Sequence, residues 1–409
     1  MAFSDPPLLN SVGVHEPLAL RAILEVHTAS GLVGLGETYG DAGHLQLLSQ
    51  AAVAVIGASP FDVGRLWGVV RSTLARGHGA NLSSFGPVTS GKVIGSVVAP
   101  FDSALYDLQG QINREPVWAI LGGKHRDTVD FSGYLFYKWA AHPEAKPDSW
   151  GEAVDPAGIV RQARKMVGEF GFKSLKLKGG VFDPEQEAAA VEALRVAFPD
   201  LPLRIDPNGA WSVETSVRIG DRLGSTLEYY EDPTMGLTGM SEVARRSATP
   251  LATNMCVVEN GHLPEAVRRN SVQVILIDQH YWGGFLPSLR LASLCQVFGI
   301  GVSMHSNSHL GISLAGMVHL GAAVENLSYA LDTHWPWKDP SEDVVETSHL
   351  NFHHGAITVP DRPGLGVELD APAMARMHET YLASTIRTRN DTGYMKTIDP
   401  DYEYVAPRW

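Results

Sequence analysis

The chain has 409 residues, 44% of them hydrophobic and 19% charged, with a formal net charge of −13 at pH 7. This composition is typical of a globular protein with a large apolar core, and the negative charge argues against nucleic acid or an acidic membrane surface as a partner. The only cysteines are Cys256 and Cys295, and we find neither an apolar leader nor a run of about 18 apolar residues, so we expect a cytoplasmic protein without disulfides.

The first part of the chain predicts an α+β domain, which we place at residues 1–125. Its beginning is rich in proline and is expected to be irregular. Alternating apolar residues on both sides of the turn at 29–31 predict an antiparallel hairpin. The predicted elements, in chain order, are strands at 20–26 and 32–37, helices near 42–56 and 61–75, a glycine-rich loop at 77–84 and an amphipathic helix around 98–112.

From about residue 126 to 354, short apolar runs alternate with helical stretches. Strands are expected at 129–136, 174–178, 203–206, 227–231, 250–254, 274–278, 301–305 and 329–332. Six of these runs end in a polar residue, at intervals of 28, 25, 23, 24 and 27 residues: Lys178, Asp206, Glu231, Asn254, Asp278 and His305. Repeated βα units of this length predict a closed barrel of parallel strands, whose carboxyl ends meet at one mouth.

The remaining residues, 355–409, are too few to fold alone. They predict a short strand at 364–368, a helix at about 371–384 and a polar tail. We expect this segment to return to the N-terminal domain and complete it.

Two lysines stand two residues apart in the run at 174–180, and the alternation places both on one face of a strand. Repulsion between the neighbouring ammonium groups of Lys176 and Lys178 would lower their proton affinity and make a lysine usable as a base. The alternative is an exposed strand with two solvated lysines.

Asp206, Glu231 and Asn254 end three neighbouring strands and offer only oxygen ligands. This set suits Mg²⁺, which prefers few carboxylates and keeps positions open for water or substrate. Zinc is disfavoured because the set contains no cysteine or histidine. The alternative is a polar ring that closes the end of the barrel by hydrogen bonds.

Asp278 and His305 end the next two strands, so the carboxylate can orient and activate the imidazole as a general acid or base. Lys178 would lie on the opposite side. Two bases beside a divalent cation suit removal of a proton next to a carboxylate, because the cation stabilises the negative charge of the enediolate. A Lys or His base with Mg²⁺ is the pattern of the enolase superfamily.

Seven motifs together resemble the glucarate dehydratase family of that superfamily, over nearly the whole chain. They are LKLKGG (175–180), DPNGAW (206–211), YYEDP (229–233), LATNM (251–255), IDQHYW (277–282), HSNSH (305–309) and LDTHWPW (331–337). The resemblance implies a modified barrel, (β/α)₇β, with an α+β capping domain. It also implies a dehydratase that converts D-glucarate, and L-idarate, to 5-dehydro-4-deoxy-D-glucarate and water.

The same resemblance implies a role for each site residue. Mg²⁺ would bind to Asp206, Glu231 and Asn254. Lys178 would be one base, and His305, paired with Asp278, would be the other base and the acid that expels the hydroxyl. Lys176 would bind the chelated carboxylate. The remaining substrate contacts would be His15, Ser84, Tyr134, Asn208, Ser306, Asn307, His334 and Arg389, whose fork suits the far carboxylate.

Some features depart from the family pattern and leave alternatives open. Ser84 replaces the usual threonine, and the segment 138–150 does not match. The enzyme alternatives are dehydration of another acid sugar such as galactarate, an epimerase or racemase with the same site, and a Schiff-base aldolase. A non-catalytic relative that binds Mg²⁺ or a ligand is the other class. We also expect assembly into a homo-oligomer that binds a small dicarboxylate sugar acid.

Overall fold

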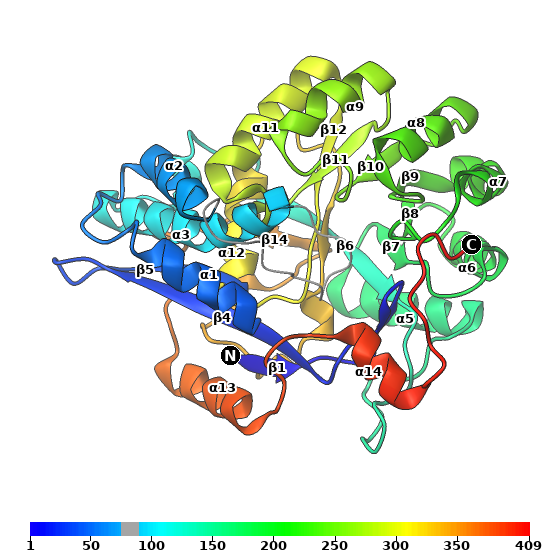
Figure 1. Ribbon diagram of the computed structural model, residues 1–409, viewed down its shortest axis with the longest axis horizontal. Helices are drawn as coiled ribbons and strands as arrows, with labels where there is room; N and C mark the ends of the chain where they lie inside the picture. The colour runs from blue at the N-terminus through cyan, green and yellow to red at the C-terminus, as the bar shows by residue number, and fades with distance from the viewer. Residues whose placement is uncertain (75–89) are drawn as a thin grey trace.

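A barrel of parallel strands surrounded by helices lies beside a smaller part that is built from the N-terminal sheet and its helices (Figure 1). The computed structural model describes residues 1–74 and 90–409. The predicted loop at 77–84, and with it Ser84, lies outside the described residues. In the part that is described, no helix has the length and apolar character needed to cross a bilayer.

The predicted N-terminal hairpin is confirmed as β4 (Leu18–His27) and β5 (Val33–Tyr39), which pair antiparallel. The prediction that residues 1–18 are irregular is wrong. β1 (Ala2–Ser4) pairs with β4, and β2 (Leu9–Asn10) pairs with β3 (Gly13–Val14). These strands are too short to show a period of two in the sequence. β1 forms because the edge of β4 offers unpaired backbone groups, whereas β2 and β3 pair with each other.

Four helices complete the N-terminal part, namely α1 (Ala42–Ala52), α2 (Val63–Leu74), α3 (Ser90–Asn113) and α4 (Val117–Ile120). α3 packs closely across β5, and glycines in the strand allow that approach. A Cβ atom at Gly34 would lie 2.1 Å from the Ala104 carbonyl oxygen, and one at Gly36 would lie 2.1 Å from that of Pro100. Any larger residue at either position would force α3 away from the sheet.

The barrel contains eight parallel strands in the order β12-β11-β10-β9-β8-β7-β6-β13. Between β12 and β13, Val302 and Leu327 form an isolated parallel bridge. The strands are β6 (Thr128–Phe136), β7 (Leu175–Lys178), β8 (Leu203–Asp206), β9 (Leu227–Glu231), β10 (Leu251–Thr253), β11 (Val274–Ile277), β12 (Gly301–Met304) and β13 (Leu331–Thr333). A helix follows each of the first seven strands, so the (β/α)₇β architecture is confirmed.

The barrel helices are α5 (Pro156–Phe170), α6 (Pro184–Ala197), α7 (Val213–Leu223), α8 (Gly236–Arg246), α9 (Leu263–Arg269), α10 (Gln279–Trp282), α11 (Phe285–Phe298) and α12 (Gly311–Ala323). Local signals set their ends. Asp155 caps the start of α5 through the Gly158 amide, and Gly171 ends it with a left-handed φ of 71°. These caps fix both ends of α5, although a long connection separates its start from the end of β6.

The C-terminal segment contacts both parts of the molecule. β14 (Ala356–Thr358) pairs antiparallel with β6, α13 (Ala371–Ala383) contacts β1, and α14 (Asp391–Ile398) contacts β3. The strand predicted at 364–368 is wrong, because Gly364 and Gly366 have positive φ angles of 68° and 74°, which are not extended. The predicted polar tail contains α14. The domain limits, 1–125 with 355–409 and 126–354, stay a prediction.

Two buried carboxylates of the N-terminal part cap helices of the barrel. Glu37 on β5 accepts hydrogen bonds from the amides of Leu310 (2.9 Å) and Ser313 (2.8 Å) at the start of α12. Asp102 on α3 accepts one from the Phe285 amide at the start of α11, at 2.7 Å. Helix N-termini carry unpaired amides and a partial positive charge, so these contacts stabilise both helices and the junction between the two parts.

Replacing Glu37 with glutamine should reduce the free energy of unfolding by about 3–5 kcal/mol, because a buried partner of Arg21 loses its charge. Burial alone would raise the pKa of Glu37, but the Arg21 guanidinium 2.7 Å away, His309 and the hydrogen bonds from Leu310 and Ser313 together lower the pKa to about 2. Since the ordinary pKa is 4.5, this stabilisation is complete above pH 4.5 and is lost as the pH falls towards 2.

Denaturant unfolding at several pH values tests this prediction. The matched control is Glu25→Gln on the neighbouring strand β4, where Glu25 pairs only with His27, a largely exposed side chain. Equal stability of the two variants at pH 7 would contradict the assigned role of Glu37.

Candidate active site

Polar side chains gather at the carboxyl ends of six neighbouring barrel strands. Each one is either the last residue of its strand or the residue that directly follows, and they are Lys178, Asp206, Glu231, Asn254, Asp278 and His305. The predicted placement at consecutive strand ends is therefore confirmed. In a parallel barrel these ends share one mouth, where active sites are found.

Lys176 lies in a buried acidic cluster below that mouth. Its Nζ atom is 2.5 Å from Glu231 Oε2, 2.7 Å from Asp332 Oδ2 and 3.5 Å from Asp206 Oδ2. Burial would lower the pKa of Lys176, but Asp332 and Glu231 outweigh it and raise the pKa well above its ordinary value. Lys176 therefore stays protonated, which suits binding of a carboxylate and does not suit proton abstraction.

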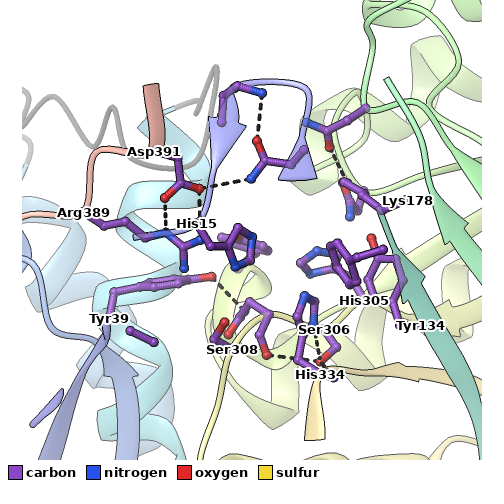
Figure 2. A pocket seen from close by; sticks show the side chains of 18 of the residues that line it. His15, Tyr39, Tyr134, Lys178, His305, Ser306, Ser308, His334, Arg389 and Asp391 are labelled. Atoms are coloured by element: carbon purple, nitrogen blue, oxygen red, sulfur yellow. Dashed lines mark hydrogen bonds and ion pairs between the residues drawn. The ribbon is translucent and has the colours of Figure 1, made fainter. Parts of the chain in front are cut away.

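Lys178 lines the cavity at the mouth (Figure 2) and contacts the same cluster through Asp206. The register of β7 and β8 pairs it with Asp206, and its Nζ atom lies 2.7 Å from Asp206 Oδ2. The same ammonium group donates a hydrogen bond to Asn208 Oδ1 at 2.9 Å, and the Tyr134 hydroxyl donates one to Asp206 Oδ2 at 3.1 Å. Lys178 is thus fixed at the mouth with its amine towards the cavity.

Asp206, Glu231 and Asn254 lie close enough together to be tested as a metal site. Asp206 and Glu231 both lie within 3.5 Å of the Lys176 ammonium group, and the Asn254 amide is 3.3 Å from Glu231 Oε1. Glu231 is fully buried, and burial together with Asp206 raises its pKa well above the ordinary range, although the Lys176 ammonium group lies 2.5 Å from Oε2. Several buried carboxylates thus share one ammonium group, and this excess of negative charge and the oxygen-only donor set fit Mg²⁺.

Asn254 would supply an amide oxygen to that set. Across residues 1–74 and 90–409, no three or more His, Cys, Asp or Glu side chains are arranged to hold a metal ion, so a metal site here would need an amide ligand. Asp232 fixes the backbone at this position, because its Oδ2 atom accepts the backbone amide of Asn254 at 2.8 Å and its Oδ1 atom accepts the Thr253 hydroxyl.

Asp278 and His305 form the predicted pair. Asp278 Oδ2 lies 2.9 Å from His305 Nδ1, while Asp278 Oδ1 is bound by the backbone and ring of His280. Burial would raise the pKa of Asp278, but the two histidines lower it well below its ordinary range. Asp278 therefore stays a carboxylate that can stabilise a protonated His305.

His305 and Lys178 stand on different walls of the mouth. Around the barrel, β7 and β12 are separated by two strands in one direction and by four in the other. Both side chains line the same cavity. This arrangement fits one base on each face of a bound substrate.

The far wall of the cavity contains Arg389 and His15 (Figure 2). The Arg389 guanidinium group donates two hydrogen bonds to the Asp391 carboxylate, from Nε to Oδ1 at 2.7 Å and from Nη2 to Oδ2 at 2.9 Å. Asp5 accepts from Arg389 Nη1 at 3.1 Å and lies 3.1 Å from His15 Nδ1. We expected Arg389 to bind both oxygens of a substrate carboxylate. This bidentate contact is not available, because the Nε and Nη2 atoms of Arg389 already bind Asp391.

Changing Arg389 to lysine should raise the Michaelis constant by about 10- to 100-fold and change kcat by less than about threefold, because a single ammonium group cannot hold Asp391 and a substrate together. Steady-state kinetics test this. Arg387→Lys is the matched control, since Arg387 donates to the backbone carbonyls of Tyr381 and Ser384 and does not line the cavity. An unchanged Michaelis constant in Arg389→Lys would remove Arg389 from the substrate site.

The structure brings most of the predicted site residues to one cavity. Those that line it are His15, Tyr134, Lys178, Asn208, Asn254, His305, Ser306, Asn307, His334 and Arg389. Four others, Lys176, Asp206, Glu231 and Asp278, lie directly behind its surface and contact residues that line it or one another. Ser306 accepts the His334 amide at 3.1 Å, and Asn307 donates to the Tyr39 hydroxyl at 2.8 Å, so the segment after β12 is held by the segment after β13 and by β5.

Sequence analysis did not identify several residues of this site. Asp332 binds Lys176, and His280 binds Asp278; both occur in motifs already singled out, LDTHWPW and IDQHYW. Lys92 on α3 also lines the cavity, with its Nζ atom 4.3 Å from the centre of the Tyr281 ring. No signal in the sequence links Lys92 to the barrel, because only tertiary packing brings α3 over the mouth.

The sequence is similar to those of known proteins over most of its length. The family model described as Enolase C-terminal domain-like matches residues 158–373, which is more than half of the chain. A probable glucarate dehydratase of Streptomyces coelicolor is 49% identical, and the alignment covers 99% of this chain and 96% of that protein.

Solved structures agree over the full length. A crystal structure of an enolase from Mycobacterium smegmatis complexed with tartrate is 57% identical, with a TM-score of 0.95, and covers 100% of this chain and 96% of that one. An enolase from Thermobispora bispora complexed with magnesium and formate is 53% identical, with a TM-score of 0.96, and covers 100% and 97%.

Proposed function

The chain belongs to the enolase superfamily and is a hydro-lyase of the glucarate dehydratase type, and on that premise we propose that it is a Mg²⁺-dependent dehydratase of D-glucarate. The product would be 5-dehydro-4-deoxy-D-glucarate, and L-idarate would be a second substrate. The observation that carries the proposal is the pair of bases, Lys178 and His305, on different walls around an oxygen-donor set.

Mg²⁺ held by Asp206, Glu231 and Asn254 would supply the positive charge that stabilises an enediolate. The rest of the chemistry belongs to side chains. Lys178 removes the proton next to the carboxylate from one face of the substrate, and His305 removes it from the other face. His305, as the imidazolium stabilised by Asp278, then gives a proton to the leaving hydroxyl, and water departs.

The other residues bind and orient the substrate. Lys176, which stays protonated, offers its ammonium group to the reacting carboxylate. His15 and Arg389 face the distal end, and their contacts with Asp5 hold them there. Two bases that share one enediolate also permit exchange between D-glucarate and L-idarate, which differ in configuration at the reacting carbon.

Product analysis with several acid sugars tests the proposal. We expect release of a keto acid and water from D-glucarate and L-idarate, loss of turnover when Mg²⁺ is chelated, and recovery when Mg²⁺ is added back. Turnover that persists without a metal would contradict the enediolate mechanism. Exclusive dehydration of galactarate would change the proposed substrate but not the roles of the site residues. Inversion of configuration without loss of water would change the proposed reaction to epimerisation at the same site.

Three expectations, about the substrate, the location and the assembly of the protein, accompany the proposal. The substrate is a small dicarboxylate, and tartrate, the ligand of the Mycobacterium smegmatis enolase, has the same chemistry. A cytoplasmic location and assembly into a homo-oligomer stay predictions, which fractionation and light scattering would test.

A further inference from the structure

One histidine beside the proposed base pair has no role in the scheme above. The Asp278 carboxylate is shared, since Oδ2 lies 2.9 Å from His305 Nδ1 and Oδ1 lies 2.7 Å from His280 Nδ1. The His280 amide also donates to Oδ1, at 2.8 Å. All of these groups except His305 are at most 3% exposed, so no solvent competes for the carboxylate.

The other ring nitrogen of His280 is also engaged. His280 Nε2 lies 2.8 Å from the Ser313 hydroxyl, and Arg21 Nη2 donates to the same hydroxyl at 3.5 Å. A carboxylate only accepts, so in a neutral His280 the proton is on Nδ1 and Nε2 accepts from Ser313. In this series of hydrogen bonds Arg21 donates to Ser313, Ser313 donates to His280, and His280 donates to Asp278.

We propose that His280 is a positioning residue, which fixes the orientation of the Asp278 carboxylate and limits the negative charge that reaches His305. An apolar side chain would fill the same space without these contacts. The geometry is specific, because within residues 1–74 and 90–409 the His280 ring bonds to Asp278 and Ser313 and has no hydrogen bond to Lys178 or the oxygen-donor set. The kinetic part of this inference rests on the proposed function, whereas its electrostatic part does not.

The proposal predicts how His305 should respond when His280 is removed. Without the His280 ring, Asp278 Oδ1 keeps only backbone donors, so more of the carboxylate charge acts on His305 and favours its protonated form. Other charged or titratable groups lie near His305 or near the hydrogen bonds of His280, and they stay in place in the variants: Arg21, Glu37, Lys92, Lys176, Asp206, Tyr281, His309 and His334.

The first experiment measures the pKa of His305 by NMR of the full-length protein labelled with ¹⁵N-histidine. In His280→Leu we expect the pKa to rise by about one unit relative to the wild type. In His280→Asn, whose side-chain amide can replace the Nδ1 donor, we expect most of the wild-type value to be restored. An unchanged pKa in His280→Leu would overturn the proposal, whatever the reaction of the enzyme is.

The second experiment measures deuterium exchange at the reacting carbon from each epimer. His280→Leu should slow exchange on the His305 face by about 10- to 100-fold and leave the Lys178 face unchanged. Equal loss on both faces would show a general structural role and overturn the proposal. Absence of exchange and dehydration in the wild type would instead contradict the proposed function, and the NMR result would still decide the role of His280.

Ser313→Ala keeps the proposal testable if His280→Leu does not fold. This change removes the hydroxyl donor to His280 Nε2 and leaves Asp278 and both bases intact. We expect a smaller rise in the pKa of His305 and slower exchange on the His305 face alone. No change in either measurement would overturn the proposal.

Discussion

Replacing His305 with asparagine should abolish proton exchange on one face of the substrate and preserve it on the other. His305 lies 2.9 Å from Asp278 and on a different wall from Lys178, so the two bases act separately. General-base catalysis contributes about 10²- to 10⁴-fold, and we expect a loss at the upper end because His305 also serves as the acid for the leaving hydroxyl. Dehydration of both epimers should therefore fall together.

Exchange into solvent deuterium, followed by NMR of each epimer, separates these effects. Lys178→Met is the reciprocal variant, and it should remove exchange from the epimer that His305→Asn leaves active. Both variants should retain the folded state, since neither residue belongs to the apolar core. If His305→Asn stopped exchange from both epimers equally, the assignment of one base to each face would be wrong.

Replacing Glu231 with glutamine should abolish exchange on both faces at once. Glu231 is the buried carboxylate nearest to Lys176 and supplies one of the two charges of the oxygen-donor set. Without it, Mg²⁺ binds more weakly and the enediolate loses its main stabilisation, so we expect a loss of at least about 10⁴-fold. The two variants should therefore differ in kind. His305→Asn removes one base, whereas Glu231→Gln weakens the Mg²⁺ binding on which proton removal by either base depends.

A binding measurement tests the same variant without turnover. A ligand that binds only the folded state raises the melting temperature, so added Mg²⁺ should stabilise the wild type and fail to stabilise Glu231→Gln. Glu228→Gln is the matched control, since Glu228 lies at the other end of β9 and pairs with Arg204. Equal stabilisation of Glu231→Gln and the wild type by Mg²⁺ would contradict the metal assignment.

The barrel and its polar strand ends were predictable because each depends on local sequence. A strand of four or five residues followed by a capped helix sets the repeat, and the last side chain of each strand must then face the mouth. Lys178 and Asp206 illustrate this, since the register of β7 and β8 pairs them directly. The spacing alone does not predict the reaction, and it was the resemblance of the strand-end motifs to a known family that predicted the dehydration and the role of each residue.

Features that depend on partners distant in the sequence were not predictable. The fork of Arg389 is taken by Asp391, two residues away, yet sequence alone does not show that the side chain turns inwards to that carboxylate. Lys92 reaches the mouth only because α3 packs across β5. β1 forms because β4 has a free edge, and the strand expected at 364–368 fails because its glycines take positive φ angles.

The carboxylates that cap α11 and α12 also determine how the N-terminal part can move. Glu37 and Asp102 hold it where the chain leaves β11 and β12, through buried contacts that cannot open without exposing helix ends. On the β8 side, the connection between Ser11 and Asn208 is a single hydrogen bond of 3.1 Å between partly buried groups. Beside β6, which neighbours β7, backbone hydrogen bonds from Leu9 to Tyr137 (2.7 Å) and from Trp139 to Pro7 (3.2 Å) hold the N-terminal part as well. We therefore expect this part to keep its position over the mouth when the substrate enters.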